Sequence, residues 1–407
     1  MRKINPDNFT IATRGTSREI NRQIALNLIR THQPISRADL ARLMNVRRGL
    51  ASLLVGELLS ENLIFEGATG EAVGPGRKPT FLYIDSRERS VVGVDIRATR
   101  TFIMVTDLMG RQLSGVSSFP TERDFNKLIV ELGRRIKQVL DDQTAPGVCE
   151  GVGVSVPGMV DVSGSTIVHA PTLGWRNVNL RDPLAAALGV PVHIENSGKA
   201  CALAQVWATR GDIKASSDLV FVTVSDGVGV GIVIGGELLR GRHNIAGEFG
   251  HVPLNVDGPR CSCGATGCWE AYISNLATLS RYFGRDLTNQ KLQNSEVLDF
   301  TVEDLIVRAR AGDGKALAAV HATARYLGLG LASIITTIDP ARIYVGGEIT
   351  TAWDLIEPTI RTALRERTLT GFAAATEIRV VPAEDYPRLR GAVALVAAPA
   401  FAAPMVA

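Results

Sequence analysis

Three of the chain's five cysteines lie within eight residues and have the spacing of a metal site. Cys261, Cys263 and Cys268 stand two and five positions apart, and His251 precedes the first of them by ten positions. Three thiolates and one imidazole suit a closed, four-coordinate zinc site, so we predict a structural Zn²⁺ held by these side chains. A disulfide is the alternative, but no apolar secretory segment follows Met1, and an odd cysteine count favours a reducing compartment.

The composition indicates a globular protein with two or three domains. The 407 residues are 45% hydrophobic and 5% aromatic, which is enough apolar material for several cores. The segment 391–407 is too short and too weakly apolar for a convincing membrane span, and we expect it to form a terminal helix packed on a neighbour. We therefore expect a cytoplasmic protein without membrane insertion.

The positive charge is concentrated in the N-terminal part. Residues 1–90 contain 14 Lys and Arg against 9 Asp and Glu, whereas the remainder has 30 against 32. A basic excess at one end suggests contact with nucleic acid there, although so small a surplus is weak evidence by itself.

The same N-terminal part has the element order of a winged helix-turn-helix. Apolar residues at helical spacing predict a first helix around residues 20–29. Ser36 with Asp39 predicts the cap of a short second helix, a turn follows at 44–46, and a leucine-rich third helix covers 50–59. Strands over 63–65 and 81–84 then flank a glycine-rich loop. We predict a DNA-binding domain over residues 1–86.

In that arrangement the third helix enters the major groove, so the residues at its start are the candidates for base contacts. These are Arg47, Arg48 and Ser52. The tip of the wing supplies Arg77 and Lys78, which could reach phosphates or a minor groove. The alternative is a helical packing module whose arginines only solvate one face.

From Val91 onward, glycine-punctuated strands alternate with helices in two rounds. The first round has predicted strands over 91–96, 101–106, 111–118 and 151–156 and a helix over 125–140. The second has strands over 219–224, 230–234 and 343–345 and helices over 315–338 and 355–365. Two such halves predict a bilobal α/β fold with a ligand cleft between the lobes.

At this point the residues resemble a known family, the ROK group of repressors, open reading frames and kinases. The matching pieces are Gly93 to Ile96, Pro157 and Gly158, Ala170 to Trp175, Glu195 and Asn196, Gly227 to Gly231, Glu248 to His251, the cysteine cluster, and Gly346 and Gly347. With the winged helix included, the resemblance covers nearly the whole chain, and the Glu-x-Gly-His and cysteine motifs are its specific parts.

The resemblance implies an actin-like, ribonuclease H-like fold and a sugar ligand. It implies a first lobe over 87–195 with a C-terminal helix over 386–407 packed back on it, and a second lobe over 196–385 with the zinc site and an oligomerisation surface. Asn196, Glu248, His251 and Glu270 match family residues that hydrogen-bond sugar hydroxyls. Zinc would hold one nitrogen of His251 and turn the other toward the ligand. A zinc site without any sugar is the alternative.

Three departures from the kinase branch of the family argue against phosphoryl transfer. The aspartate that serves as the kinase base is replaced by Ser197, and loss of a positioned base costs about 10²–10⁴ in rate. The first phosphate motif, Asp-x-Gly-Gly-Thr-Lys in kinases, runs Asp95, Ile96, Arg97, Ala98, Thr99, Arg100 here. The second, Gly-Thr-Gly-Val-Gly, runs Ser225, Asp226, Gly227, Val228, Gly229, and Asp226 would repel a triphosphate.

These observations predict a repressor of carbohydrate genes that binds operator DNA and senses a sugar or sugar derivative without catalysis. A homodimer or homotetramer is expected, because two heads about one helical turn apart read more sequence than one. An active sugar kinase with a DNA-binding domain is one alternative. A repressor controlled by a protein partner of the sugar transport system is another.

Overall fold

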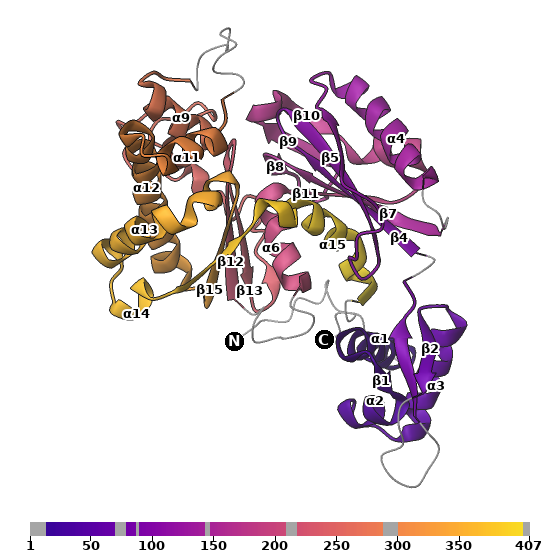
Figure 1. Ribbon diagram of the computed structural model, residues 1–407. Helices are drawn as coiled ribbons and strands as arrows, with labels where there is room; N and C mark the ends of the chain where they lie inside the picture. The colour runs from indigo at the N-terminus through magenta and orange to yellow at the C-terminus, as the bar shows by residue number, and fades with distance from the viewer. Residues whose placement is uncertain are drawn as a thin grey trace.

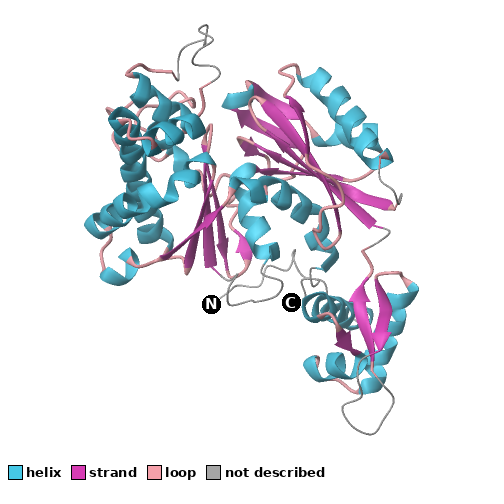
Figure 2. Cartoon of the chain, viewed as in Figure 1, coloured by secondary structure: helices cyan, strands magenta, loops and turns pink. Residues whose placement is uncertain are grey.

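The computed structural model describes residues 14–69, 79–86, 89–142, 147–208, 218–287 and 300–401. A small N-terminal head lies below two larger lobes that stand side by side (Figure 1). Each lobe has a five-stranded sheet with helices on its faces, as Figure 2 shows. The predicted bilobal α/β architecture is confirmed.

The head is a helix-turn-helix followed by a hairpin, as predicted. Its elements are α1 (Arg14–His32), β1 (Ile35–Ser36), α2 (Arg37–Leu43), α3 (Arg48–Ser60), β2 (Ile64–Thr69) and β3 (Thr80–Ile84). The Ser36 side chain caps α2 by accepting a hydrogen bond from the Asp39 amide. Asn45, with φ of 53°, ends α2 and turns the chain into α3. The wing residues Arg77 and Lys78 lie outside the described residues.

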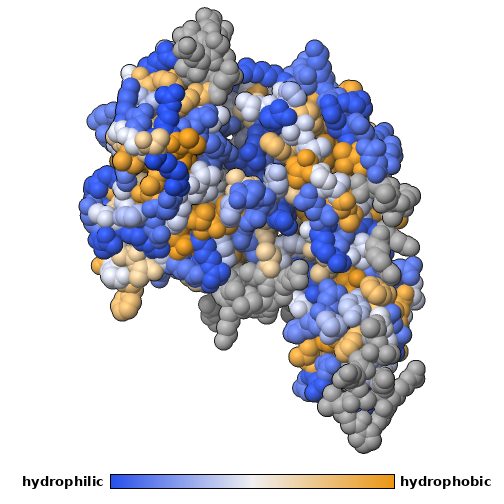
Figure 3. All heavy atoms as spheres, viewed as in Figure 1, coloured by the Kyte–Doolittle hydropathy of each residue, from blue (hydrophilic) through white to orange (hydrophobic). Residues whose placement is uncertain are grey.

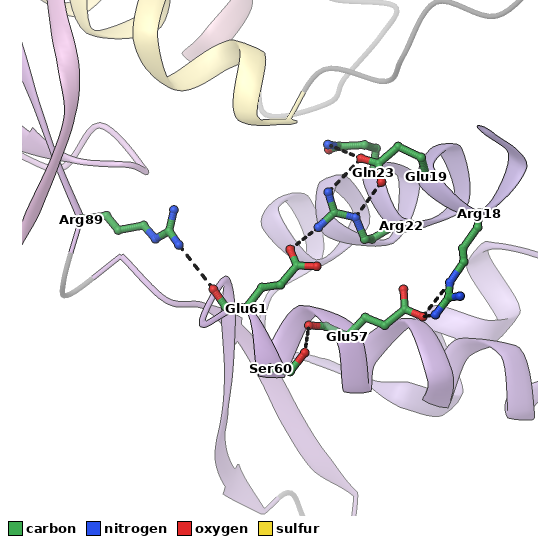
Figure 4. A network of polar contacts seen from close by, with 8 residues as sticks. All are labelled: Arg18, Glu19, Arg22, Gln23, Glu57, Ser60, Glu61 and Arg89. Atoms are coloured by element: carbon green, nitrogen blue, oxygen red, sulfur yellow. Dashed lines mark hydrogen bonds and ion pairs between the residues drawn. The ribbon is translucent and has the colours of Figure 1, made fainter. Parts of the chain in front are cut away.

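Ion pairs join the first and third helices of the head (Figure 4). Arg18 pairs with Glu57, and Arg22 pairs with Glu61. The carbonyl of Glu61 also accepts a hydrogen bond of 3.3 Å from Arg89, at the start of the first lobe. Such exposed pairs add little stability, but they occupy the carboxylates of α3.

The two lobes have sheets of the same topology. In each sheet the first strand is central. On one side the second strand pairs antiparallel with the first and the third pairs antiparallel with the second, and on the other side the fourth and fifth strands run parallel to the first. The strand orders are β11-β7-β4-β5-β6 and β14-β13-β12-β15-β16. Such a repeat brings the carboxyl ends of parallel strands in both lobes to the region between them, where open α/β sheets bind ligands.

The first lobe, together with α6, has the following elements: β4 (Arg89–Ile96), β5 (Arg100–Asp107), β6 (Ser117–Pro120), α4 (Phe125–Asp141), β7 (Val148–Val156), β8 (Met159–Val160), β9 (Thr166–Ala170), η2 (Pro171–Leu173), β10 (Trp175–Asn179), α5 (Arg181–Leu188), β11 (Val192–Asn196) and α6 (Ser197–Ala208). The predicted strand over 111–118 is wrong over most of its length, because only its last two residues belong to β6. A turn at 108–109 with Gly110 at a φ of 75° reverses the chain, and residues 110–116 have no strand structure beyond a single bridge between Thr106 and Gln112.

The second lobe and the C-terminal segment contain β12 (Asp218–Val224), β13 (Val228–Ile234), β14 (Glu237–Leu238), η3 (Phe249–His251), α8 (Glu270–Ile273), α9 (Asn275–Phe283), α11 (Val302–Arg310), α12 (Gly314–Ile338), β15 (Arg342–Gly346), η4 (Glu348–Ala352), α13 (Trp353–Arg367), α14 (Gly371–Ala374), β16 (Glu377–Val381), η5 (Ala383–Asp385) and α15 (Pro387–Phe401). By length and composition α12 could cross a membrane, but 61% of its most apolar window is buried inside the protein. It packs against α9, α11 and α13 as a core helix.

Two helices, α6 and α15, lie side by side between the lobes and above the head (Figure 1). Their backbones touch, since a Cβ on Gly391 of α15 would overlap the carbonyl of Ala200 in α6. Helix α15 also lies directly on the first lobe's sheet, where a Cβ on Gly153 would overlap the Ala392 carbonyl. Glycine at these two positions permits the close approach.

Candidate functional site

A cleft that is open to solvent lies between the lobes. Residues at the carboxyl ends of β4, β7 and β11 line it from the first lobe, and the β12–β13 turn, η3 and α8 line it from the second. Hydrophilic residues gather where the two lobes face each other (Figure 3). The predicted sugar-binding residues Asn196, Glu248, His251 and Glu270 all line this cleft.

The four predicted metal ligands form one cluster. The ligand atoms of His251, Cys261, Cys263 and Cys268 all lie within 4.8 Å of one another. Cys263 and Cys268 sulfurs are 3.8 Å apart, and Cys261 Sγ is 3.7 Å from His251 Nδ1. Four ligands about 2.3 Å from a tetrahedral zinc ion stand about 3.8 Å from one another, so the donor set fits such an ion. The residues can therefore bind a metal.

The local chain makes this cluster possible through two glycines. Gly264 and Gly267 adopt φ of 99° and 74°, and a Cβ on Gly267 would overlap the carbonyl of Asn255. An isolated bridge between Pro253 and Cys268 aligns the segment that carries His251 with the cysteine loop. Burial raises the pKa of the Cys261 and Cys268 thiols, and a bound dication would favour their thiolate forms.

Trp269 fixes the cysteine loop to the core of the second lobe. Its side chain is 1% exposed, and its indole Nε1 donates to the carbonyl of Tyr326 at 2.8 Å. The ring lies directly over Gly330 of α12, where a Cβ would overlap it. The metal cluster is thereby attached to the longest helix of the protein.

The imidazole of His251 stands between the cysteine cluster and the cleft. Its Nδ1 faces Cys261, whereas its Nε2 lies 4.0 Å from Glu248 Oε2. Burial raises the pKa of Glu248, while His251 and Lys199 oppose that shift. One ring nitrogen is thus directed at the metal ligands and the other toward a partly buried carboxylate.

Glu270 connects the cysteine loop to the β12–β13 turn. Its Oε2 accepts a hydrogen bond of 2.9 Å from the Val228 amide, and its Oε1 accepts one of 2.9 Å from the Ser262 hydroxyl. A carboxylate has about four acceptor sites, so Glu270 can still accept hydrogen bonds from a ligand.

The side chain of Asn196 makes hydrogen bonds to backbone groups that the sequence does not predict. Its Oδ1 accepts hydrogen bonds from the amides of Gly198 and Lys199 and caps α6, and its Nδ2 donates to the Gly158 carbonyl at 2.8 Å. The next residue, Ser197, also lines the cleft. Asn196 therefore joins the ends of β7 and β11 in the first lobe to the start of α6.

Two cations in and beside the cleft, Lys199 and Arg388, escaped the sequence analysis. Lys199 is 1% exposed, and its ammonium group donates to both the carbonyl and the side-chain oxygen of Asn244. Burial lowers the pKa of Lys199. Arg388, at the start of α15, lines the cleft although it follows Asn196 by almost two hundred residues. Lys199 lies in the segment after Asn196 and could have been found there, but only the fold brings Arg388 to the cleft.

The candidate DNA contacts are on the surface of the head. Arg47 is the N-cap of α3, and Arg48 and Ser52 follow in its first turns; all three are exposed. Within the described residues, no ion pair or side-chain hydrogen bond engages the Arg47 or Arg48 guanidinium. The other arginines around α3 are paired, including Arg18 with Glu57 and Arg22 with Glu61.

A helix-turn-helix head, two lobes of repeated topology and a polar cleft beside a metal-binding cluster define a bilobal actin-like protein with a DNA-binding domain. Residues 91–398 match the ROK family, and the chain belongs to that family. It is 30% identical over 361 residues to the xylose repressor of Bacillus spizizenii, covering 88% of this chain and 89% of the relative.

Two solved structures show the same fold. A ROK family transcriptional regulator, a homologue of the E. coli MLC protein, matches with a TM-score of 0.76 and 24% identity over 95% of this chain and 97% of that one. A ROK family glucokinase from Streptomyces griseus, in complex with glucose and AMPPNP, matches with a TM-score of 0.65 and 29% identity. The glucokinase match covers 98% of that chain but only 75% of this one.

Proposed function

We propose that this protein is a transcriptional repressor whose head binds operator DNA and whose cleft binds a small sugar that controls the head. The xylose repressor relative extends over 88% of the chain, whereas the glucokinase structure matches 75% of it. The observation that carries the proposal is that two helices begin at the cleft and end at the head.

Both of these helices have their first residues among the cleft residues. Asn196 and Ser197, at the start of α6, and Arg388, in the first turn of α15, line the cleft. Because α6 and α15 touch along their backbones at Ala200 and Gly391, a displacement of one displaces the other.

Residues at the ends of both helices contact α1, the first helix of the head. The guanidinium of Arg30 lies 3.5 Å from the ring centroid of Trp207 in α6 and 5.2 Å from that of Phe401 in α15. Arg30 also donates to the Trp207 carbonyl at 3.1 Å, and Asn27 donates to the Phe401 carbonyl at 2.7 Å. A ligand that shifts the helix starts can therefore change the position of the head, with a coupling of about 1–3 kcal/mol.

In the cleft, we assign Glu248, His251, Glu270 and Asn196 to the sugar. The carboxylates supply acceptors for sugar hydroxyls, as the partial exposure of Glu248 and Glu270 permits. Zn²⁺ on His251 and the three cysteines is the proposed structural cofactor, since the Nδ1 atom faces the thiols and the Nε2 atom faces Glu248. In the head, Arg47, Arg48 and Ser52 are the proposed base contacts, and Arg77 and Lys78 remain predictions for the wing.

We propose further that the protein is not an enzyme. Ser197 has no useful basicity near neutral pH, and Asp226 lines the cleft in the β12–β13 turn. A coupled assay for ADP release across a sugar panel tests this: sugar-dependent turnover that is lost in Asn196→Ala would contradict it.

A cytoplasmic homodimer or homotetramer is the proposed working form, with the second lobe as the contact surface, because paired heads read a two-fold operator. The experiment for the effector is calorimetric titration of the zinc-replete protein with free sugars. Binding of at least one sugar is expected. Failure of every sugar would favour control by a protein partner of the sugar transport system.

A further inference from the structure

Five charged residues form a second group in the cleft, which the proposed sugar site does not use. Asp95 and Arg97 come from the first lobe, Asp226 and Glu348 come from the second, and Arg388 comes from α15. We call these five residues the ionic wall. Arg97, Asp226 and Arg388 line the cleft, and Asp95 is fully buried behind them.

Arg97 pairs with carboxylates of the ionic wall, and Arg388 lies in the electrostatic field of the same carboxylates. Arg97 donates through Nε to Asp95 Oδ2 at 2.7 Å, and its Nη1 lies 3.6 Å from Glu348 Oε1 across the two lobes. Burial works against the charge on Arg388, yet Asp95 and then Glu348 raise the pKa of Arg388. Arg388 also donates a hydrogen bond of 3.3 Å to the Thr223 hydroxyl, so the charge of each guanidinium is partly balanced by carboxylates of the wall itself.

The balance of charge in the wall is negative. Three carboxylates stand against two guanidinium groups, and Glu248 and Glu270 add two further carboxylates to the same cleft. In the second lobe, Asn275 donates a hydrogen bond of 3.2 Å to Glu348. A phosphate group in this cleft would meet repulsion in a partly desolvated site, where charges interact more strongly than in water.

We propose that the ionic wall is a specificity determinant that excludes phosphate esters and nucleotides, so that the cleft takes an uncharged sugar. This inference rests on the proposed sugar-binding function. Asp226 carries most of the exclusion, because its carboxylate lines the cleft and, among the residues that the structure describes, no arginine pairs with it as Arg97 pairs with Asp95. Sugar hydroxyls, in contrast, are donors that an excess of carboxylates accepts.

The test compares matched neutral and phosphorylated ligands by calorimetry on the zinc-replete full chain. Glucose is paired with glucose 6-phosphate, N-acetylglucosamine with its 6-phosphate, and xylose and MgATP are added. In each pair that gives heat, the neutral sugar is expected to bind at least about tenfold more tightly, and MgATP is expected not to bind. Tighter binding of a phosphate ester, or binding of MgATP, overturns the inference.

Two variants assign the exclusion to the wall. Asp226→Asn removes a charge but keeps a side chain of the same shape. We expect it to reduce the ratio of the phosphate ester's Kd to the neutral sugar's Kd at least about threefold. Glu348→Gln is the second variant, in case the first does not fold, and Asp142→Asn on the surface of the first lobe is the matched control. If Asp226→Asn and Glu348→Gln both fold and leave this ratio of Kd values unchanged, the inference is overturned. If no sugar of either kind binds, the proposed sugar-binding function itself fails, which is a different outcome from preference for the ester.

Discussion

The head and the cleft are built in different ways. In the head, the candidate DNA contacts Arg47, Arg48 and Ser52 lie within six residues of one another and are exposed. In the cleft, Asn196, Glu270 and Arg388 come from separate segments, and each also holds part of the fold together. We infer that changes in the head alter binding alone, whereas changes in the cleft alter binding and stability together.

The largest expected effect is loss of the metal from the cleft wall. Cys263→Ser removes one of four ligands, and structural zinc sites contribute about 10–16 kcal/mol of metal binding in small peptides, so metal content should fall from about one ion per chain to near zero. The melting temperature and sugar binding should fall with it. Atomic absorption on the desalted protein measures the metal, with Cys149→Ser as the control that keeps it. Retention of one zinc per chain in Cys263→Ser would show that the ligand set is wrong.

In the head, replacement of Arg47 and Arg48 by Ala should abolish specific operator binding without destabilising the fold. Each major-groove arginine contact contributes about 1–3 kcal/mol, so loss of the pair should weaken operator affinity roughly 30- to 10⁴-fold. Gel shifts with an operator selected from a random duplex library measure this, and thermal unfolding checks the fold. Arg134→Ala, an exposed arginine of α4, is the control. Unchanged gel shifts in the double variant would remove both residues from the DNA interface.

A third variant separates the two regions from each other. Arg30→Ala removes the side chain that the Trp207 and Phe401 rings enclose. It should abolish the effect of sugar on operator affinity, about five- to 150-fold in the unaltered protein, while sugar binding stays the same. Arg18→Ala, on the same helix but paired with Glu57, is the control. A sugar response of full size in Arg30→Ala would exclude this route.

The smallest effect lies outside both regions. Arg134 and then Arg135 lower the pKa of Glu131 to about 2. Because the folded pKa is below the ordinary value of 4.5, this stabilisation is present above pH 4.5 and is lost as the pH falls toward 2. Glu131→Gln should cost about 0.5 kcal/mol or less at pH 7, since the carboxylate is partly exposed and its charge is screened by solvent. Urea unfolding at pH 7 and pH 3 checks this, and a cost above about 1 kcal/mol at pH 7 would contradict it.

The sequence predicted the parts of the protein that are local in the chain. The helix-turn-helix follows from apolar spacing and the Ser36 cap, and the proximity of the four metal ligands follows from their spacing along the chain. The strand over 111–118 failed because alternation of apolar residues cannot reveal the reversal at Gly110.

The features of the site that could not be predicted from the sequence depend on contacts between segments that are far apart in the chain. Arg388 reaches the cleft only because α15 returns between the lobes, and Gly391 permits its contact with α6. Lys199 is buried in α6, and its partner Asn244 is 45 residues away. No periodicity in one segment can indicate such pairings.

The central claim is that a ligand in the cleft changes the affinity of the head for DNA. The direct measurement is fluorescence anisotropy of a selected operator with the zinc-replete protein, with and without each sugar that calorimetry shows to bind. At least one neutral sugar should change the operator Kd by about five- to 150-fold. A sugar that saturates the cleft and leaves the operator Kd unchanged within twofold would contradict the claim.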